Sequence, residues 1–279
     1  MSVCILRPMF LILSFVALLF CSEISSSEPR STTESLTYPN GILDLSGARL
    51  TFTEEFDHIS VSARGPGTRW IAHTPWNGDF GEAQFVDPIP GFPFSVVDGV
   101  LSIEAHKGVD GKWRSGLLSS RDRDGPNGHG FAQQYGYFEM RAKLPAGPGT
   151  WPAFWLIGID KTAASAEVDI MEQYGAFPDI YHTNAHVFYK DGTHLDIGEK
   201  IPVKSGLMEQ SFNTYGAKID PDWITYYFNR RQVWQTPTTQ YFRQPMYILL
   251  DLALGGGWPI DQTINPSIMK VDYIKVYSW

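Results

Sequence analysis

Apolar and polar residues alternate in short segments along most of this chain, from about residue 41 to the C-terminus. In the segment VLSIEAHKG, Leu101, Ile103 and Ala105 fall on one face of an extended strand, and the polar residues fall on the other. A period of two residues is typical of strands that bury one face. The clearest segments of this kind are residues 100–108, 136–147, 223–234 and 270–279.

The turn residues between these segments favour many short strands. Gly, Pro, Asn and Asp separate the alternating segments, and the chain contains 26 glycines and 19 prolines. The segment WITYYFNRRQVW is typical of a hairpin that turns near Asn229 and Arg230. No window of about 12 residues has the 3.6-residue period of a helix. The pattern therefore predicts one all-β domain over residues 41–279, built as an antiparallel β-sandwich.

The N-terminal residues have a different character. Residues 1–27 carry one cation, Arg7, followed by an apolar run over 9–20 and then small polar residues, which is typical of a secretory signal peptide. This run of about 12 residues is shorter than the roughly 20 that cross a bilayer. A retained signal anchor and a lipoprotein signal ending at Cys21 are the alternatives. Residues 28–40 predict a linker. We therefore expect a secreted protein, extracellular or periplasmic, with no membrane association after cleavage.

The composition argues against several classes of partner and chemistry. The formal net charge is −8 and no run of Lys or Arg occurs, so nucleic acid and anionic membranes are not expected as partners. Both cysteines, Cys4 and Cys21, lie within the predicted signal peptide. The mature chain would therefore contain no disulfide and no cysteine nucleophile.

The segment SAEVDIMEQYG holds three carboxylates among apolar residues. On a helix, Glu167 and Glu172 would lie about 140° apart and could not share a face. On a regular strand, Glu167 and Asp169 would share a face and Glu172 would point to the other side. A β-bulge near Ile170 and Met171 would add one residue and bring all three acids to the same side.

Three carboxylates on one face repel each other, so we expect at least one of them to keep its proton at neutral pH. Glycoside hydrolysis needs such a set, because one carboxylate must be ionised and another protonated. Trp151, Trp155 and Trp258 lie in segments rich in glycine and aromatic residues, and tryptophan rings stack on the C–H faces of sugars. The residues alone leave two alternatives open, namely solvated acids on an exposed face and tryptophans that belong to the core.

With these residues the chain resembles glycoside hydrolase family 16, the jelly-roll β-glycanases. The resemblance rests on EVDIME, which matches the family's E-x-D-x-x-E signature, and on YGYFEMRAKLPAGPGTWPAFWLIG, LLDLALGGGWP and VDYIKVY; it extends over residues 49–279. It implies a jelly roll of two antiparallel sheets, similar to concanavalin A, with a concave active-site cleft. It also implies Glu167 as nucleophile, Glu172 as general acid/base and Asp169 between them, in a retaining double displacement. The extra residue of the signature argues against the lichenase and xyloglucan-transferase branches.

The resemblance also implies contacts with the substrate. The residues concerned are Trp151, Trp155, His186, Trp258, Glu82 and Gln84, the last two near the non-reducing-end subsites. The chain departs from the laminarinase pattern at Gly81, where those members carry an asparagine. This departure weakens the expectation of a strict preference for β-1,3-glucan.

For metals and cofactors, the resemblance implies none that catalysis requires, but a structural calcium ion on the convex face. Its ligands would be the carbonyl of Gly99 and the carboxylate of Asp272, since calcium prefers oxygen ligands. The alternative is that Asp272 only caps an edge strand. A zinc pair of His182 and His186 is a second metal hypothesis, which lacks an evident third ligand.

The sequence therefore predicts a secreted, monomeric, retaining endo-β-glycanase that acts on a β-1,3/1,4-linked glucan or a bacterial exopolysaccharide. Three alternatives stay open. A galactan-cleaving member of the family, of agarase or carrageenase type, would share the bulged signature. A transglycosylase would use the same residues with a sugar acceptor, and a non-catalytic carbohydrate-binding module would use the same sandwich and aromatic residues.

Overall fold

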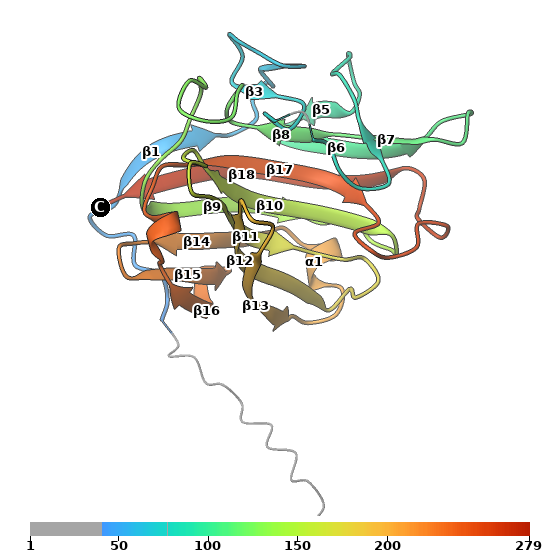
Figure 1. Cartoon of the computed structure of the whole chain (residues 1–279). Helices are drawn as coiled ribbons and strands as arrows, with labels where there is room; N and C mark the ends of the chain where they lie inside the picture. Colours follow the sequence, from blue (N-terminus) through green and yellow to red (C-terminus); the bar gives the residue numbers. More distant parts are fainter. Residues whose placement is uncertain (1–40, 77) are drawn as a thin grey trace, which may run out of the picture. The chain divides into compact units, whose positions relative to one another are not determined.

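The computed structural model of the chain describes residues 41–76 and 78–279. The predicted signal peptide (1–27) and linker (28–40) lie outside the described residues. All described residues belong to one compact unit, and its strands form two stacked sheets (Figure 1). Within the described ranges, no helix is long and apolar enough to span a membrane.

The first sheet has ten strands. They are β1 (Arg49–Glu54), β4 (Gln84–Phe85), β5 (Phe94–Val97), β6 (Val100–Lys107), β7 (Trp113–Ser115), β9 (Gly136–Lys143), β14 (Asn213–Ile219), β15 (Trp223–Phe228), β16 (Arg231–Pro237) and β18 (Ser267–Ser278). Their order is β16-β15-β14-β9-β18-β6-β7-β4, with β1 paired to β18 and β5 paired to β6.

The second sheet has eight strands in the order β13-β12-β11-β10-β17-β8-β3-β2. They are β2 (Val61–Ser62), β3 (Trp70–Ile71), β8 (Leu117–Ser119), β10 (Thr150–Gly158), β11 (Ala164–Glu172), β12 (Ile180–Tyr189), β13 (His194–Pro202) and β17 (Met246–Leu254). In the described part of the chain, helical structure is limited to α1 (Leu207–Gln210) and the 3-10 turn η1 (Gln240–Phe242). The prediction of an all-β sandwich is confirmed.

Two strand pairs differ from the prediction of purely antiparallel sheets. The pairs β2–β3 and β4–β7 are parallel, and each involves only two residue pairs. Antiparallel pairing follows from tight hairpins, whereas these short strands are joined through a loop or through other strands. Nothing in the connection therefore forces the chain to reverse direction between them.

The alternating segments form strands as predicted. Leu101, Ile103 and Ala105 of β6 are fully buried. The hairpin β15–β16 turns at Asn229 and Arg230, which adopt φ values of 49° and 59°. Positive φ at both central residues suits the right-handed twist of the flanking strands.

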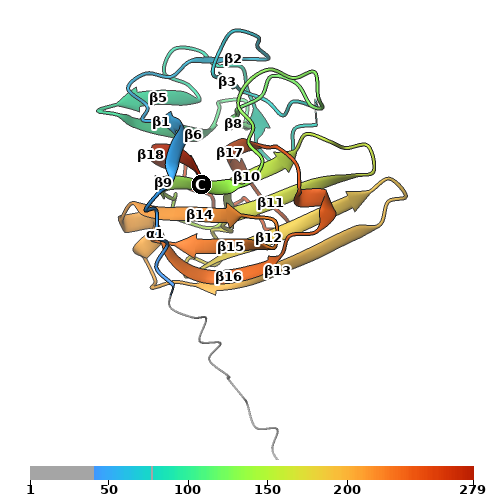
Figure 2. The ribbon, with the colours of Figure 1, turned by 90° about the vertical axis from the view of Figure 1, so that its left-hand side faces the viewer.

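The main core lies between the two sheets, and a second apolar cluster lies on the outer face of the eight-stranded sheet. Figure 2 shows β14, β15 and β16 lying over β11, β12 and β13, and the Tyr226 hydroxyl of β15 donates a 2.7 Å hydrogen bond to the carbonyl of Asn184 in β12. In β10, Leu156 faces this core, whereas Trp155 and Ile157 face outward into the second cluster. Apolar residues thus cover both faces of β10, so acids on its neighbour β11 lie in a largely dry setting.

Candidate active site

The strand β11 contains the predicted bulge. Asp169 pairs with Asn184 of β12 and Glu172 pairs with His182, so three steps along β11 match two steps along β12. The same shift occurs against the other neighbour, β10, between its residues 154 and 155. One extra residue in this position restores the phase of the side chains. The prediction of a bulge near residues 170 and 171 is confirmed.

Because of the bulge, the three acids share one face. Glu167, Asp169 and Glu172 line a cavity of about 180 Å³ on the outer face of the sheet, together with Trp76, Phe80, Trp151, Ala153 and Trp155. The residues between the acids, Val168, Ile170 and Met171, are buried in the core between the sheets. The apolar segment therefore satisfies both requirements, because its hydrophobic side chains pack inward and its carboxylates face the cavity.

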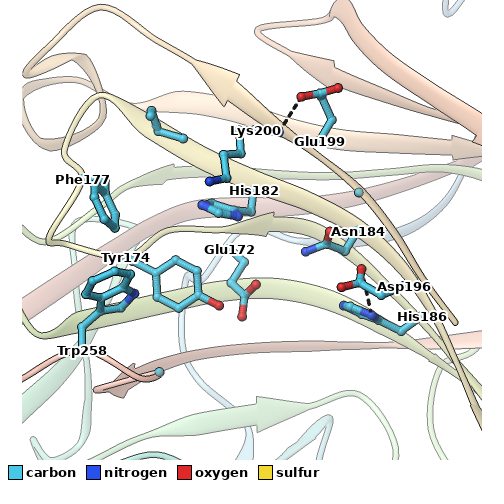
Figure 3. A pocket seen from close by; sticks show the side chains of 13 residues that line it. Glu172, Tyr174, Phe177, His182, Asn184, His186, Asp196, Glu199, Lys200 and Trp258 are labelled. Carbon is cyan, nitrogen blue, oxygen red and sulfur yellow. Dashed lines mark hydrogen bonds and ion pairs between the residues drawn. The ribbon is translucent and has the colours of Figure 1, made fainter. Parts of the chain in front are cut away.

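Glu172 lies at the junction of two cavities. It lines the small cavity and also a larger one of about 920 Å³, which extends along β12 and β13 toward Trp258 (Figure 3). Trp151 Nε1 donates a 2.7 Å hydrogen bond to Glu172 Oε1. The Tyr174 hydroxyl also points toward this carboxylate. Glu172 is thus fixed where it can reach a group that bridges the two cavities.

Burial controls the electrostatics of the three acids. It raises the pKa of Glu167 well above the ordinary value, and the nearby Asp169 raises it further. Burial likewise raises the pKa of Asp169, with Glu172 as the next cause. For Glu172, burial raises the pKa while the hydrogen bond from Trp151 opposes part of this effect. These shifts support the prediction that the cluster keeps at least one proton at neutral pH.

His186 connects the acids to the edge of the sheet. Its Nε2 lies 2.9 Å from Asp169 Oδ2, and its side chain is only 13% exposed. Its Nδ1 lies 3.0 Å from His194 Nε2 and 3.4 Å from Asp196 Oδ1, both on β13. The position of His186 on the strand after the acids agrees with the prediction.

Comparison with known proteins identifies the family. Residues 109–275 match the family of glycosyl hydrolases family 16. This chain belongs to glycosyl hydrolases family 16. Among curated relatives, it is 33% identical over 261 residues to the endo-1,3-1,4-beta-glycanase EglC of Rhizobium meliloti (strain 1021), covering 85% of this chain and 53% of that protein. It is 31% identical over 210 residues to the beta-glucanase of Rhodothermus marinus, covering 66% of this chain and 70% of that protein.

Solved structures show the same fold. The non-specific endo-beta-1,3(4)-glucanase SCLam aligns with a TM-score of 0.71 at 27% identity, over 86% of this chain and 94% of that chain. The catalytic domain of the laminarinase from Thermotoga petrophila RKU-1 aligns with a TM-score of 0.67 at 25% identity, over 83% of this chain and 98% of that chain. The expected jelly roll of family 16 is thereby confirmed. The chain spans about half the length of the Rhizobium relatives that it matches.

The predicted aromatic contacts lie around the family 16 acids in different ways. Trp151 is half-buried and Trp155 is 6% exposed, and both line the small cavity. Trp155 Nε1 donates a 2.9 Å hydrogen bond to Asp251, so its ring forms a fixed wall. Trp258 lines the larger cavity and is 41% exposed. Its ring lies edge-on to that of Phe177, with the ring centroids 4.8 Å apart. Their roles in substrate binding stay predictions.

Glu82 and Gln84 do not line either cavity that contains the acids. Glu82 is exposed and packs against Gly255, and its backbone N–H donates to the carbonyl of Leu254. Gln84 lines a separate hollow with Arg114. Gly81 has a φ of +80°, and a Cβ there would meet the Leu254 carbonyl at 2.9 Å, so this position suits glycine. The structure brings this segment near the cavities through Phe80, which directly precedes it and lines the small cavity, and through its contact with the loop after β17.

Sequence reasoning missed four residues of the site. Trp76 and Phe80 form walls of the small cavity, Tyr174 points toward Glu172, and Asp251 lies beneath Trp155. Asp251 is fully buried, and burial raises its pKa to about 8. Its signal was present in LLDLAL, where a lone acid interrupts an apolar strand. Trp76 and Phe80 come from a loop, and no periodicity predicts where a loop folds.

The predicted calcium ligands fit the ion only in part. The Asp272 carboxylate accepts a 2.5 Å hydrogen bond from the Arg141 guanidinium, which occupies one of its oxygens. Gly99 lies in the turn between β5 and β6, and a Cβ there would be 3.7 Å from the Glu55 carbonyl oxygen, so this turn packs close to Glu55. The calcium site stays a prediction, and the proposed reaction does not involve it.

The zinc hypothesis receives no third ligand. Among residues 41–76 and 78–279, one group of three candidate metal-ligating side chains comes within mutual reach, namely Glu167, Asp169 and His186. His182 is not part of it. Burial and the nearby Lys200 lower the pKa of His182, so this ring is neutral at neutral pH.

Proposed function

We propose that this chain is a secreted, retaining endo-β-glycanase that hydrolyses β-1,3- or mixed β-1,3/1,4-linked glucan. The observation that carries the proposal is the bulge in β11, which brings Glu167 and Glu172 to the same cavity. A carbohydrate-binding module would gain nothing from burying three acids without a lysine or arginine partner. In the described residues, no salt bridge joins these acids to either kind of cation.

The geometry supports distinct roles for the two glutamates. The sugar to be attacked would occupy the small aromatic cavity, and the leaving sugar would occupy the larger one. Glu172 lines both, so its carboxyl would protonate the glycosidic oxygen at the junction. Glu167 would attack the anomeric carbon to form a covalent glycosyl-enzyme, as in retaining enzymes, whose carboxyl groups lie about 5–5.5 Å apart.

The second half of the reaction would reverse the proton transfer. Once the leaving sugar departs, Glu172 is ionised and can take a proton from water that enters from the larger cavity. That water attacks the glycosyl-enzyme, releases the sugar and returns the Glu167 carboxylate. Burial raises the pKa of Asp169, and a hydrogen bond from His186 Nε2, 2.9 Å away, would oppose this and favour the charged carboxylate beside Glu167. That charge would help to separate the protonation states of the two glutamates.

The relatives support a glucan as substrate. EglC and ExsH of Rhizobium meliloti are both named endo-1,3-1,4-beta-glycanases, and the Rhodothermus marinus relative is named beta-glucanase. Another relative, 31% identical over 161 residues, is the keratan-sulfate endo-1,4-beta-galactosidase of Sphingobacterium multivorum. This relative makes a galactan backbone the second candidate.

A panel of polymers tests the proposal. The chain without residues 1–27 is incubated with laminarin, barley glucan, lichenan, agarose and keratan sulfate, and the products are sized. We expect laminarin and barley glucan to be shortened to oligosaccharides. Cleavage of agarose or keratan sulfate alone would replace the glucan by a galactan, and products longer than the substrate would indicate transglycosylation. Proton NMR during the reaction should show the β-anomer first, because retention preserves the configuration.

Secretion is tested separately. The full chain is expressed in a bacterium, and the N-terminus of the exported protein is sequenced. We expect cleavage near residue 27, whereas a full-length product in the membrane fraction would favour a signal anchor.

A further inference from the structure

A chain of hydrogen-bonding groups runs from the buried acids to the edge strand β13. On one side, His186 Nε2 lies 2.9 Å from Asp169 Oδ2. On the other side, its Nδ1 lies 3.0 Å from His194 Nε2. Both ring nitrogens of His186 are therefore engaged by protein groups. Figure 3 shows His186 beside Asp196 at one end of the larger cavity.

His194 is held in place by packing as well as by this contact. It is the first residue of β13 and pairs in register with Phe188 of β12. The two rings stack, with centroids 4.3 Å apart and an interplanar angle of 10°. Although His194 is exposed, its ring has a defined orientation, which directs Nε2 at His186.

The direction of the hydrogen bonds follows from the chemistry of the end group. In the proposed function Asp169 is ionised, so its carboxylate can only accept a hydrogen bond. His186 must then carry its proton on Nε2, which leaves Nδ1 as an acceptor. The Asp169 carboxylate favours this tautomer, and an N–H donor at Nδ1 favours it further. His194 Nε2 is placed to be that donor.

A second group competes for the same nitrogen. Asp196 Oδ1 lies 3.4 Å from His186 Nδ1, and a carboxylate there favours a proton on Nδ1. With the proton on Nδ1, the lone pair of Nε2 would face the Asp169 carboxylate, and the two would repel. His194 makes the shorter contact, at 3.0 Å against 3.4 Å.

We propose that His194 is a positioning residue of the active site, whose Nε2–H holds His186 in the tautomer that donates a hydrogen bond to Asp169. This inference rests on the proposed function of the three acids. His194 reaches the lining of the larger cavity through its contact with His186. Its effect on the reaction is carried by Asp169, which loses its donor when the tautomer changes.

Two substitutions separate the hydrogen bond from the packing. His194→Phe keeps a ring that stacks on Phe188 and removes the donor. His194→Gln gives up the stack but carries an amide N–H at a comparable reach. We expect His194→Phe to lower kcat about tenfold with KM changed less than about twofold, because the acids are misaligned while the cavities are intact. We expect His194→Gln to stay within about threefold of the unsubstituted chain.

Two outcomes would overturn the inference from kinetics. One is an unchanged kcat in His194→Phe, which would mean that the donor has no effect. The other is an equal loss in both variants, which would show that the aromatic stack is what counts.

A spectroscopic measurement tests the tautomer without any substrate. Long-range proton–nitrogen correlation spectra of the ¹⁵N-labelled free protein are recorded at about pH 8, where ordinary histidines are neutral. The His186 signals are assigned with a His186→Asn variant. We expect the proton on Nε2 in the unsubstituted chain and in His194→Gln, and a larger share of it on Nδ1 in His194→Phe. A tautomer that is the same in all three would refute the inference, even if the polymer panel had already shown the proposed function to be wrong.

Discussion

The outer faces of the two sheets each contain buried carboxylates, but the carboxylates on the two faces differ in whether a cation compensates their burial. Glu139 on β9 of the ten-stranded sheet is fully buried, and every oxygen has strong partners. Arg230 donates to it twice, at 2.9 and 2.8 Å, while Tyr137 and Tyr273 donate at 2.8 and 3.0 Å. This carboxylate is held as a charge whose burial is compensated.

The acids of β11 lack such compensation. Glu167, Asp169 and Glu172 have a tryptophan N–H, a tyrosine hydroxyl and a histidine as neighbours, and burial raises the pKa of all three. A stable fold does not need this arrangement, because an arginine could have been placed here as Arg230 was placed beside Glu139. The difference indicates that the acids which share a cavity without a cation are suited to chemistry, whereas Glu139, paired with an arginine, serves the structure.

The comparison is tested most strongly by replacing each of the two glutamates on β11 with glutamine. Glu172→Gln should lower kcat/KM about 10²–10⁴-fold, because a general acid contributes that much. Glu167→Gln should lower it at least as far, since no covalent intermediate can form. Neither should lower the thermal midpoint, because a neutral amide relieves repulsion among the acids. Activity is measured on a soluble glucan and the midpoint by circular dichroism.

Azide distinguishes the two roles. With an activated β-glycoside, Glu167→Ala and azide should give an α-glycosyl azide, whereas Glu172→Ala should give the β-product. Unchanged turnover in either Gln variant, or the same azide product from both Ala variants, would contradict the assignment.

The opposite result is expected on the other sheet. Arg230→Met should reduce the free energy of unfolding by about 3 kcal/mol, at the low end for a broken buried pair because 40% of the Arg230 side chain is exposed. Urea titration measures this loss. Specific activity of the folded protein should stay within about twofold. A large loss of activity without loss of stability would mean that the Glu139 network serves the reaction.

The pH dependence of stability gives a third test, through Asp251. Burial raises its folded pKa to about 8, from about 3.9 in an unfolded chain. Because the pKa is raised, the stability contributed by this group is full below about pH 4 and is lost as the pH rises to about 8. As the pH rises from 5 to 8, the free energy of unfolding should therefore fall less in Asp251→Asn than in the unsubstituted chain. The difference between the two falls should be about a few kcal/mol at most. Equal urea midpoint shifts in the two proteins would rule out this titration.

The smallest expected effect concerns the hydrogen bond to Glu172. Trp151 Nε1 donates at 2.7 Å and lowers the pKa of this carboxyl. Trp151→Phe keeps an aromatic ring and removes the bond, so the pKa of Glu172 should rise. The alkaline limb of the kcat/KM profile, where the acid loses its proton, should then move up by less than about one pH unit. Trp258→Phe, which alters the larger cavity without touching this bond, should leave the limb in place.

Much of the site could be predicted from local sequence. In EVDIME, a strand can bring all three acids to one side only if it contains a bulge, and the structure contains that bulge. The resemblance to family 16 also places His186, on the strand after the acids. Glu139 shows the limit of such reasoning, since GYFEMRAK alternates yet both Tyr137 and Glu139 are buried. Their cover comes from Arg230 and Tyr273, which are distant in sequence.

The sequence by itself determined the strands, the bulge and the identity of the acids, because each of these depends on neighbours within a few positions. Only the tertiary structure decided which acids are left without a cation, that Trp76 and Phe80 close the small cavity, and that His194 reaches His186. These features depend on contacts between segments that approach only when the sheets stack and the loops fold over them. Charge compensation and cavity shape are properties of that packing, and no local pattern of residues encodes them.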